Sequence, residues 1–484
     1  QWLFVNGDNE REELGVAHDD LDEKIFQITD SYFGAYGDAY SYSNLKSSIT
    51  TMKVDYSSQI HPVHFLQAGG ELLLYDMDVF NLRAYSISNF YLDEYDVTPT
   101  EWGLYFRDKI EMGGLIVNAG VRFDSYNLGD DIEYSAVADD PTRTPVDEFG
   151  EIIEPVKWKD EVGAKIYISP RLGISHPITD RDVLHFSYNH FLQRPDWRYF
   201  YENLSYSKEG AYEEIGNPEL EPQRTVSYEV GFTHQFTDNM KVDVTAYYKD
   251  IFGWTQQSKG GDLTSTHFWF YDNADFGNAK GFELALDKRM SNNFSVDINY
   301  TYLIASGRLS DPQLGGTYLW RKLISPREVH LLDYDQTHTL SAKFAYYIPA
   351  SKNPLLGDWL INVTERYGSG LPYDSQDRGS ADVVPPENDK RMPYTNVVDL
   401  RIQKRFSYNK TGIAAFVEVF NVLNRDNTDY SPEFIPDNAE WYQSEEDLDG
   451  NGVADHLLDP EGRRHDWTVW AEPRRVKAGI EINW

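Results

Sequence analysis

The sequence predicts an all-β fold, a transmembrane antiparallel β-barrel with about fifteen strands in this chain. One reason is the alternation of residue types at the C-terminus, where one face would carry Val476, Ala478, Ile480, Ile482 and Trp484. The side chains of a strand point alternately to its two faces, so this pattern is typical of a strand between lipid and water. The other reason is an aromatic content of 15%, with 34 Tyr, because Tyr and Trp favour membrane–water boundaries.

The same alternation recurs inside the chain. Val242 and Val244 alternate with Lys241 and Asp243, and Ile298 lies between Asp297 and Asn299. A helix cannot sort such residues onto separate faces, whereas a strand does. On this basis we predict strands at 45–58, 63–77, 100–112, 114–126, 167–178, 181–193, 223–236, 239–253, 278–290, 293–306, 336–348, 357–368, 394–406, 411–424 and 473–484. Many exceed the roughly 9–11 residues that cross a bilayer, so some should project beyond it.

The predicted connections alternate in length. Short turns lie near residues 113, 180, 238, 292 and 408, and long segments such as 127–166 and 425–472 lie between them. In bacterial outer-membrane barrels the short turns are periplasmic and the long loops are extracellular. We therefore expect an integral protein of the cell outer membrane, with long loops extracellular and the C-terminus periplasmic.

Composition excludes several classes of protein. The net charge is −35, from 44 basic and 79 acidic residues, which argues against nucleic acid as a partner. No stretch approaches 18 consecutive apolar residues, so no transmembrane helix is predicted. The absence of Cys rules out disulfides and thiolate metal sites. Because the chain starts at Gln1 without a signal peptide, we expect a processed or partial chain.

Several short motifs occur in one order along the chain. They are Ser-Pro-Arg-Leu-Gly-Ile at 169–174, Gly-Asn-Pro-Glu-Leu-Glu-Pro at 216–222 followed by Tyr-Glu-Val-Gly at 228–231, Gly-Phe-Glu at 281–283, Asp-Gln-Thr-His at 335–338, Gly-Ser-Gly-Leu-Pro-Tyr at 368–373, Asp-Leu-Arg at 399–401 and Val-Phe-Asn-Val-Leu-Asn at 419–424. With the aromatic C-terminus, this series resembles the barrel of TonB-dependent outer-membrane receptors over nearly the whole chain.

That resemblance implies a 22-stranded barrel closed by an N-terminal plug that carries a TonB box. Our fifteen strands would then be the last fifteen, and the plug and the first strands would be absent from this chain. Residues 1–43 are expected to form an extracellular loop region with a short helix around 18–28, and residues 44–484 the barrel strands with their long loops.

The implied function is import of a scarce solute, such as a siderophore-like chelate, a peptide or an oligosaccharide. Its partners would be the TonB–ExbB–ExbD complex, acting through the missing plug, together with outer-membrane lipid and lipopolysaccharide. A glycan importer of the starch-utilisation type, with a surface lipoprotein as a lid, is one alternative. Pro222-Gln223 stands where that branch usually carries Trp-Glu, which favours the receptor branch. A passive porin or a structural outer-membrane barrel is a different class.

One predicted loop has the spacing of a calcium site. Its oxygen ligands would be Asp447, Asp449, Asn451, the Val453 carbonyl and Asp455, with Gly452 at the tight turn. The twelfth position is Leu458 where an EF-hand has Glu, and Asp459 could substitute from the next position. The alternative reading is an acidic loop that turns on two glycines.

Aromatic residues in the predicted extracellular loops are the candidate ligand-binding residues, because aromatic rings stack on siderophores, sugars and peptides. They are Trp197, Tyr199, Trp254, Trp269, Trp320 and Trp441. Packing of the loops on one another is the alternative role. No enzyme activity is expected, since neither a GxSxG nor an HExxH motif occurs.

Overall fold

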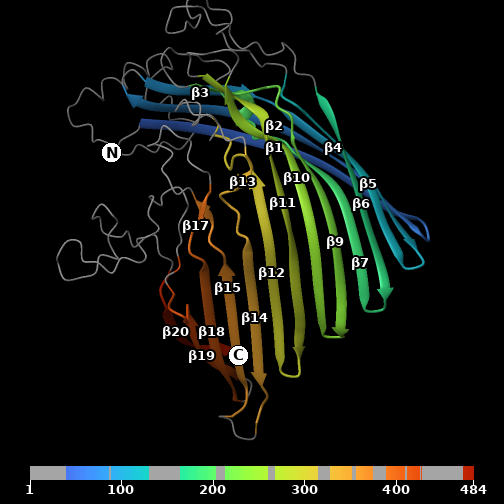
Figure 1. The fold of residues 1–484 in the computed structure, drawn as a ribbon, viewed down its shortest axis with the longest axis vertical. Coiled ribbons are helices and arrows are strands. Elements are labelled where there is room, and N and C mark those ends of the chain that lie inside the picture. Colours follow the sequence, from blue (N-terminus) through green and yellow to red (C-terminus); the bar gives the residue numbers. More distant parts are fainter. Residues whose placement is uncertain are drawn as a thin grey trace, which may run out of the picture.

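A single large sheet dominates the structure, a computed structural model that describes residues 40–86, 89–129, 164–202, 213–259, 268–313, 315, 328–351, 356–373, 388–408, 411–425, 427 and 472–483 (Figure 1). Its elements are β1 (Tyr40–His61), β2 (His64–Ser86), β3 (Asn89–Val97), β4 (Thr100–Met112), β5 (Leu115–Asn127), β6 (Lys165–Thr179), β7 (Asp182–Gln193), α3 (Arg198–Tyr201), β8 (Glu213–Ile215), β9 (Gln223–Thr237), β10 (Met240–Lys259), β11 (Phe268–Ser291), β12 (Phe294–Gly307), β13 (His330–Leu331), β14 (His338–Ile348), β15 (Trp359–Gly368), β16 (Pro372–Tyr373), β17 (Lys390–Arg391), β18 (Thr395–Tyr408), β19 (Thr411–Phe420) and β20 (Arg475–Asn483). Within these ranges no helix is long and apolar enough to cross a bilayer.

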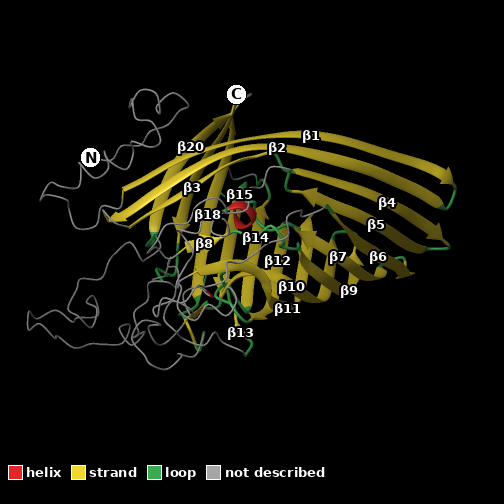
Figure 2. Ribbon diagram, turned by 90° about the horizontal axis from the view of Figure 1, so that it is seen from above, coloured by secondary structure: helices red, strands yellow, loops and turns green. Residues whose placement is uncertain are grey.

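The main sheet has 18 strands, and its long strands pair antiparallel with their neighbours along the chain. It curls into a trough, and α3 lies on the concave side (Figure 2). Among the described residues β1 and β20 are the two edge strands and do not pair with each other, so the barrel is not closed. The predicted all-β antiparallel barrel fold is confirmed as an open, curved sheet. We call the end of the sheet with short turns, such as 113–114 and 292–293, the turn end. The opposite end, where the connections between strands are long, is the loop end.

All fifteen predicted strands are present, but several are longer than predicted and β3 was missed. β2 continues to Ser86, pairing with β4 up to Leu74 and with β3 from Met77 onward. The sequence of β3 is rich in acidic residues on both faces, so it has no lipid-facing pattern to reveal it. The short pairings of β8, β13, β16 and β17 were also not predicted. The helix expected around 18–28 lies outside the described residues.

The short turns have the backbone geometry that their sequences favour. Gly113 and Gly114 both have positive φ, at 54° and 92°, and so do Asn292 and Asn293, at 51° and 72°. Two-residue hairpin turns whose twist matches that of the strands require positive φ at both positions, which Gly and Asn tolerate best. These turns therefore fix the register of the two hairpins that they join.

The two faces of the sheet differ in chemistry. On one rung, Phe232, Val244, Leu284 and Tyr300 are successive partners across β9 to β12, and the next rung carries Gly231, Thr245, Glu283 and Thr301. The apolar rungs include many exposed large side chains, such as Val230 at 50% exposure and Phe106 at 48%. The polar rungs share the face of Tyr126, which packs on α3. The convex outer face is therefore apolar, and the concave inner face is polar.

Two rows of aromatic residues bound the apolar band on the outer face. Three strands carry one ring in each row, eight residues apart: Phe236 and Tyr228 on β9, Phe294 and Tyr302 on β12, and Trp359 and Tyr367 on β15. Eight residues extend about 26 Å along a strand, or about 20 Å along the membrane normal at a tilt of about 40°. An apolar band flanked by aromatic girdles is typical of outer-membrane barrels.

We expect neighbouring substitutions on β12 to separate the two faces. Ile298 lies midway between the two aromatic rows, whereas Asn299 faces the polar interior. Ile298→Arg should destabilise the full-length protein in lipid vesicles by about 2–4 kcal/mol, because it places a charge in hydrocarbon. Asn299→Arg is the matched control and should change stability by at most about 0.5 kcal/mol. Urea titration followed by Trp fluorescence measures both, and equal losses would contradict the assignment of faces.

Candidate functional site: the inner wall and its loop end

A buried aromatic cluster lies on the inner face at the loop end of β2, β5 and β11. Phe200 and Tyr271 have no exposed surface, and Trp197 is 7% exposed. Tyr126 of β5 meets Trp197 and Phe200 edge to face, with ring centroids 6.4 and 5.6 Å apart. The full cluster consists of Met77, Leu128, Trp197, Phe200, Tyr201, Leu220 and Tyr271. It packs residues 194–202, which include α3, and residues 216–222 onto the concave side of the wall.

The motif at 216–222 holds this segment in place. Gly216 is required because a Cβ there would lie 2.7 Å from the Phe200 carbonyl oxygen. The Asn217 amide donates to the Tyr271 carbonyl at 2.8 Å, and the Tyr126 hydroxyl donates to the Leu220 carbonyl at 2.6 Å. The motif that carried the family resemblance thus joins the segment to the wall through side-chain-to-backbone hydrogen bonds.

Arg194 stabilises the cluster electrostatically. Its guanidinium lies 3.6 Å from the centroid of the Trp197 ring and donates to Glu101, which also accepts a 2.8 Å hydrogen bond from the Tyr75 hydroxyl. Nearby, burial raises the pKa of the Tyr201 hydroxyl above its usual range. The Tyr201 hydroxyl donates to the Leu128 carbonyl at 2.7 Å. Sequence analysis found Trp197 but missed Arg194 and Glu101, which lie on separate strands or loops.

The predicted ligand-binding aromatic residues do not form one exposed surface. Trp197 is buried in the cluster, and Tyr199 packs on Tyr271 with ring centroids 4.5 Å apart. The Trp254 ring lies over Gly277 and Gly307, where an added Cβ would approach it within 2.5 and 3.1 Å. Trp269 lies on β11, opposite Lys259 of β10. Trp320 and Trp441 lie outside the described residues.

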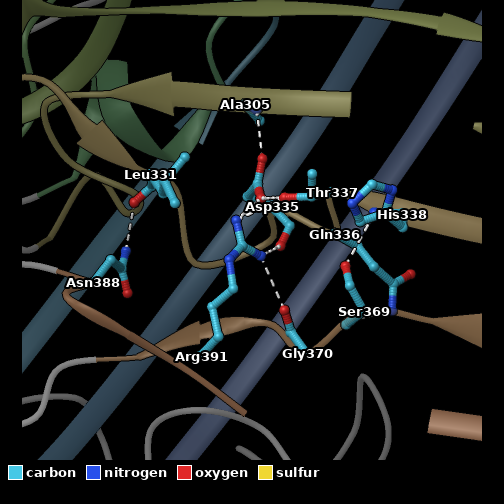
Figure 3. Close-up of polar contacts among 10 residues, drawn as sticks. All are labelled: Ala305, Leu331, Asp335, Gln336, Thr337, His338, Ser369, Gly370, Asn388 and Arg391. Atoms are coloured by element: carbon cyan, nitrogen blue, oxygen red, sulfur yellow. Dashed lines mark hydrogen bonds and ion pairs between the residues drawn. The ribbon is translucent and has the colours of Figure 1, made fainter. Parts of the chain in front are cut away.

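A second cluster is polar and joins the connection between β12 and β14 to the connection between β15 and β18 (Figure 3). We call it the Asp335 clasp, because its centre is Asp335 with Ala305, Thr337 and Arg391 as partners. The buried Asp335 carboxylate accepts hydrogen bonds from the Ala305 amide at 2.7 Å, the Thr337 hydroxyl at 2.8 Å and Arg391 at 2.5 Å. Arg391 also donates to the Gly370 carbonyl at 3.0 Å. One carboxylate thereby links β12, the 335–338 motif and β17.

Neighbouring hydrogen bonds extend the clasp. Asn388 donates to the Leu331 carbonyl at 2.6 Å and to the Asp333 carboxylate at 2.7 Å. The Ser369 hydroxyl accepts from the His338 amide at 3.0 Å, and the Ser369 amide donates to the His338 carbonyl at 2.8 Å. The motifs at 335–338 and 368–373, distant in sequence, are therefore adjacent and mutually bonded. The sequence showed both motifs but not that Arg391 joins them.

Ion pairs cover the inner face between these clusters and the turn end. Arg401 contacts Glu418 at 2.9 Å and Glu481 at 2.7 Å, linking β18, β19 and β20. Lys241 contacts Asp243 at 2.7 Å and Asp287 at 3.4 Å, and Arg366 contacts Asp399 at 2.8 Å. Among them, Lys241 and Asp243 are residues that the alternation predicted on the polar face. They give the concave wall a charged surface.

No group of three or more His, Asp or Glu residues in the described ranges is arranged to hold a metal ion. The predicted calcium ligands Asp447, Asp449, Asn451, Val453, Asp455 and Asp459 lie outside those ranges. Calcium binding there stays a prediction.

The chain belongs to the family of TonB dependent receptor-like β-barrels, whose pattern its sequence matches over residues 4–422. Barrels of this family are outer-membrane proteins of transporter and receptor type. No curated protein matches the sequence. The family resemblance drawn from the ordered motifs is confirmed.

Solved receptors share the fold at low sequence identity. The ferric-catecholate import receptor Fiu from K12 E. coli has 14% identity and a TM-score of 0.53, covering 91% of this chain and 55% of its own. The FrpB iron transporter from Neisseria meningitidis has 13% identity and a TM-score of 0.53, over 90% and 55% of the two chains. The ferric citrate transporter FecA, unliganded, has 14% identity and a TM-score of 0.54, over 93% and 56%. The chain spans about half the length of these receptors.

We expect the Asp335 clasp to stabilise the loop end measurably. Asp335→Ala would leave the Ala305 amide and the Arg391 guanidinium without their buried acceptor, so the free energy of unfolding should fall by about 2–4 kcal/mol. Glu328→Ala, at an exposed position on the same segment, is the control and should have little effect. Urea titration of the full-length protein measures both changes. An unfolding midpoint for Asp335→Ala equal to that of the control contradicts the role of the clasp.

Proposed function

We propose that the full-length protein imports a scarce solute across the outer membrane, using energy transduced by the TonB–ExbB–ExbD complex. The main support is the combination of family membership with a sheet whose apolar face is convex and whose charged face is concave. Such a wall separates hydrocarbon from a hydrated interior through which a polar solute can pass.

The named neighbours favour a metal chelate as the solute. They are described as a ferric-catecholate import receptor, an iron transporter and a ferric citrate transporter. Among siderophore-like chelates, peptides and oligosaccharides, we therefore place chelates first.

The proposed orientation places the loop end outside the cell and the turn end, with the C-terminus, in the periplasm. Two-residue turns at one end and long connections at the other support it. Lipid and lipopolysaccharide would contact the apolar outer face. TonB would act from the periplasmic side, through the plug that family resemblance implies.

A deletion strain tests the proposal. Growth is measured on three media in turn. Iron chelates are the sole source of iron in the first, peptides the sole source of nitrogen in the second, and oligosaccharides the sole source of carbon in the third. We expect loss of growth on one or more iron chelates, restored by the full-length gene only when TonB is present. Restoration without TonB would indicate a passive channel. Loss on oligosaccharides alone, with a co-purifying surface lipoprotein, would indicate the glycan importer.

We also propose that the loop at 447–459 binds calcium, because its oxygen residues have the spacing of a calcium loop. Titration calorimetry of the full-length protein should give a calcium-dependent heat that Asp449→Ala abolishes. Asp466→Ala, which changes an acidic residue outside the spacing, should leave the heat intact. A wild-type protein that gives no heat sinks this proposal.

A further inference from the structure

A cavity of about 600 Å³ on the inner wall contains more positive than negative charge. It lies over β1, β2, β4, β5, β6 and β7, in the half of the wall nearer the turn end. Its polar lining consists of Lys53, Asp55, Gln67, Tyr105, Arg107, Asn118, Arg122, Arg171 and Asn189. This surplus of positive charge is unexpected in a chain whose net charge is −35.

Two of these arginines flank a glycine on one rung of the sheet. Gly120 of β5 pairs with Arg107 of β4 on one side and with Arg171 of β6 on the other. Neighbouring strands are about 4.8 Å apart, so the two arginine backbones lie about 10 Å from each other across a position without a side chain. Asn189 of β7 extends the same rung by pairing with Arg171, and Asn118 of β5 pairs with Gly173 on the next inward-facing rung. Donor side chains from four adjacent strands thus line this part of the cavity.

Neither of the flanking arginines has a carboxylate partner in the described part of the chain. Arg107 donates to the neutral Gln67 amide oxygen, with its Nε at 2.9 Å. Arg171 lies over the Phe191 ring, 5.2 Å from the centroid. Their neighbour Arg122 differs, because Asp124 at 2.6 Å and Glu71 at 3.2 Å neutralise it.

The remaining charges of the cavity are paired. Among the described residues Asp55 is the only carboxylate in the lining, and it accepts a 2.6 Å hydrogen bond from the Tyr105 hydroxyl. Lys53 lies 3.7 Å from the same carboxylate. Two guanidiniums are therefore left to face the cavity with only neutral contacts. The planar guanidinium group matches carboxylate and phosphate oxygens in two-point hydrogen bonding.

We propose that Arg107 and Arg171 form a binding site for an oxyanion, with the side-chain amides of Asn118 and Asn189 as further donors. The oxyanion is a carboxylate or a phosphate-like group. It comes either from a free anionic solute inside the barrel or from an acidic side chain of a protein segment that enters it. The site does not depend on energised import, so it stands or falls separately from the proposed function.

Arginine-selective modification of the full-length protein tests the site. The protein in detergent reacts with phenylglyoxal, with and without inorganic phosphate, and mass spectrometry gives the rate at each arginine. If the oxyanion is a free solute, phosphate should slow reaction at Arg107 and Arg171 roughly tenfold. If the oxyanion is a protein carboxylate, Arg107 and Arg171 should be protected even when no phosphate is added. Both should then react roughly tenfold more slowly than the exposed Arg181.

A variant distinguishes anion binding from simple coverage of the wall. In either case Arg107→Gln should remove the protection of Arg171, whether phosphate or a built-in carboxylate provides it. Arg366→Gln makes the same change at an inner-wall arginine that is paired with Asp399, and it should leave that protection intact. The proposal is overturned if both arginines react at the rate of Arg181 with and without phosphate. It is also overturned if Arg171 stays protected in Arg107→Gln.

Discussion

Backbone hydrogen bonding between antiparallel strands is the constraint from which the other features of this protein follow. Hydrocarbon offers no partner for an N–H or a C=O group, so a chain that crosses it must satisfy these groups internally. The ladder runs from β1 to β20 through successive neighbours, and two-residue turns keep its register. Once the strands are paired in this way, their side chains must alternate between lipid and interior. The apolar convex face and the charged concave face are therefore one consequence of the ladder.

The loop end is organised by a different interaction. Beyond the aromatic rows the strands no longer have lipid on one side, and two clusters attach the intervening segments to the wall. Both clusters use side chains that bind backbone carbonyls or amides, as Asn217 does at Tyr271 and Asp335 does at Ala305. Buried polar groups are costly when unpaired, so such networks define one arrangement of the chain. Each cluster includes a motif that carried the family resemblance, which explains why those residue types occur there.

The sequence predicted the parts of this structure that depend on local periodicity. The strand from Phe294 to Gly307 is an example, because lipid and water impose opposite requirements on residues such as Ile298 and Asn299. It did not predict β3, because acidic residues occur on both of its faces and remove the pattern, although Tyr95 and Val97 pack against the aromatic cluster. Contacts between distant segments could not be predicted from the sequence either. Arg391 contacts Asp335, and Arg194 contacts Glu101, only because the folded sheet brings these segments together. The aromatic residues were found by type, yet type alone did not separate the buried Trp197 from an accessible ring.

The length of the strands has a consequence for long-range electrostatics. β10 has 20 residues and β11 has 24, whereas the aromatic rows lie eight apart, so the loop ends extend well beyond the bilayer. At physiological ionic strength the Debye length is only about 8 Å, so dissolved ions screen charges at the loop end from the inner wall near the turn end. The charges of the inner wall near the turn end therefore act on a solute independently of those at the loop end.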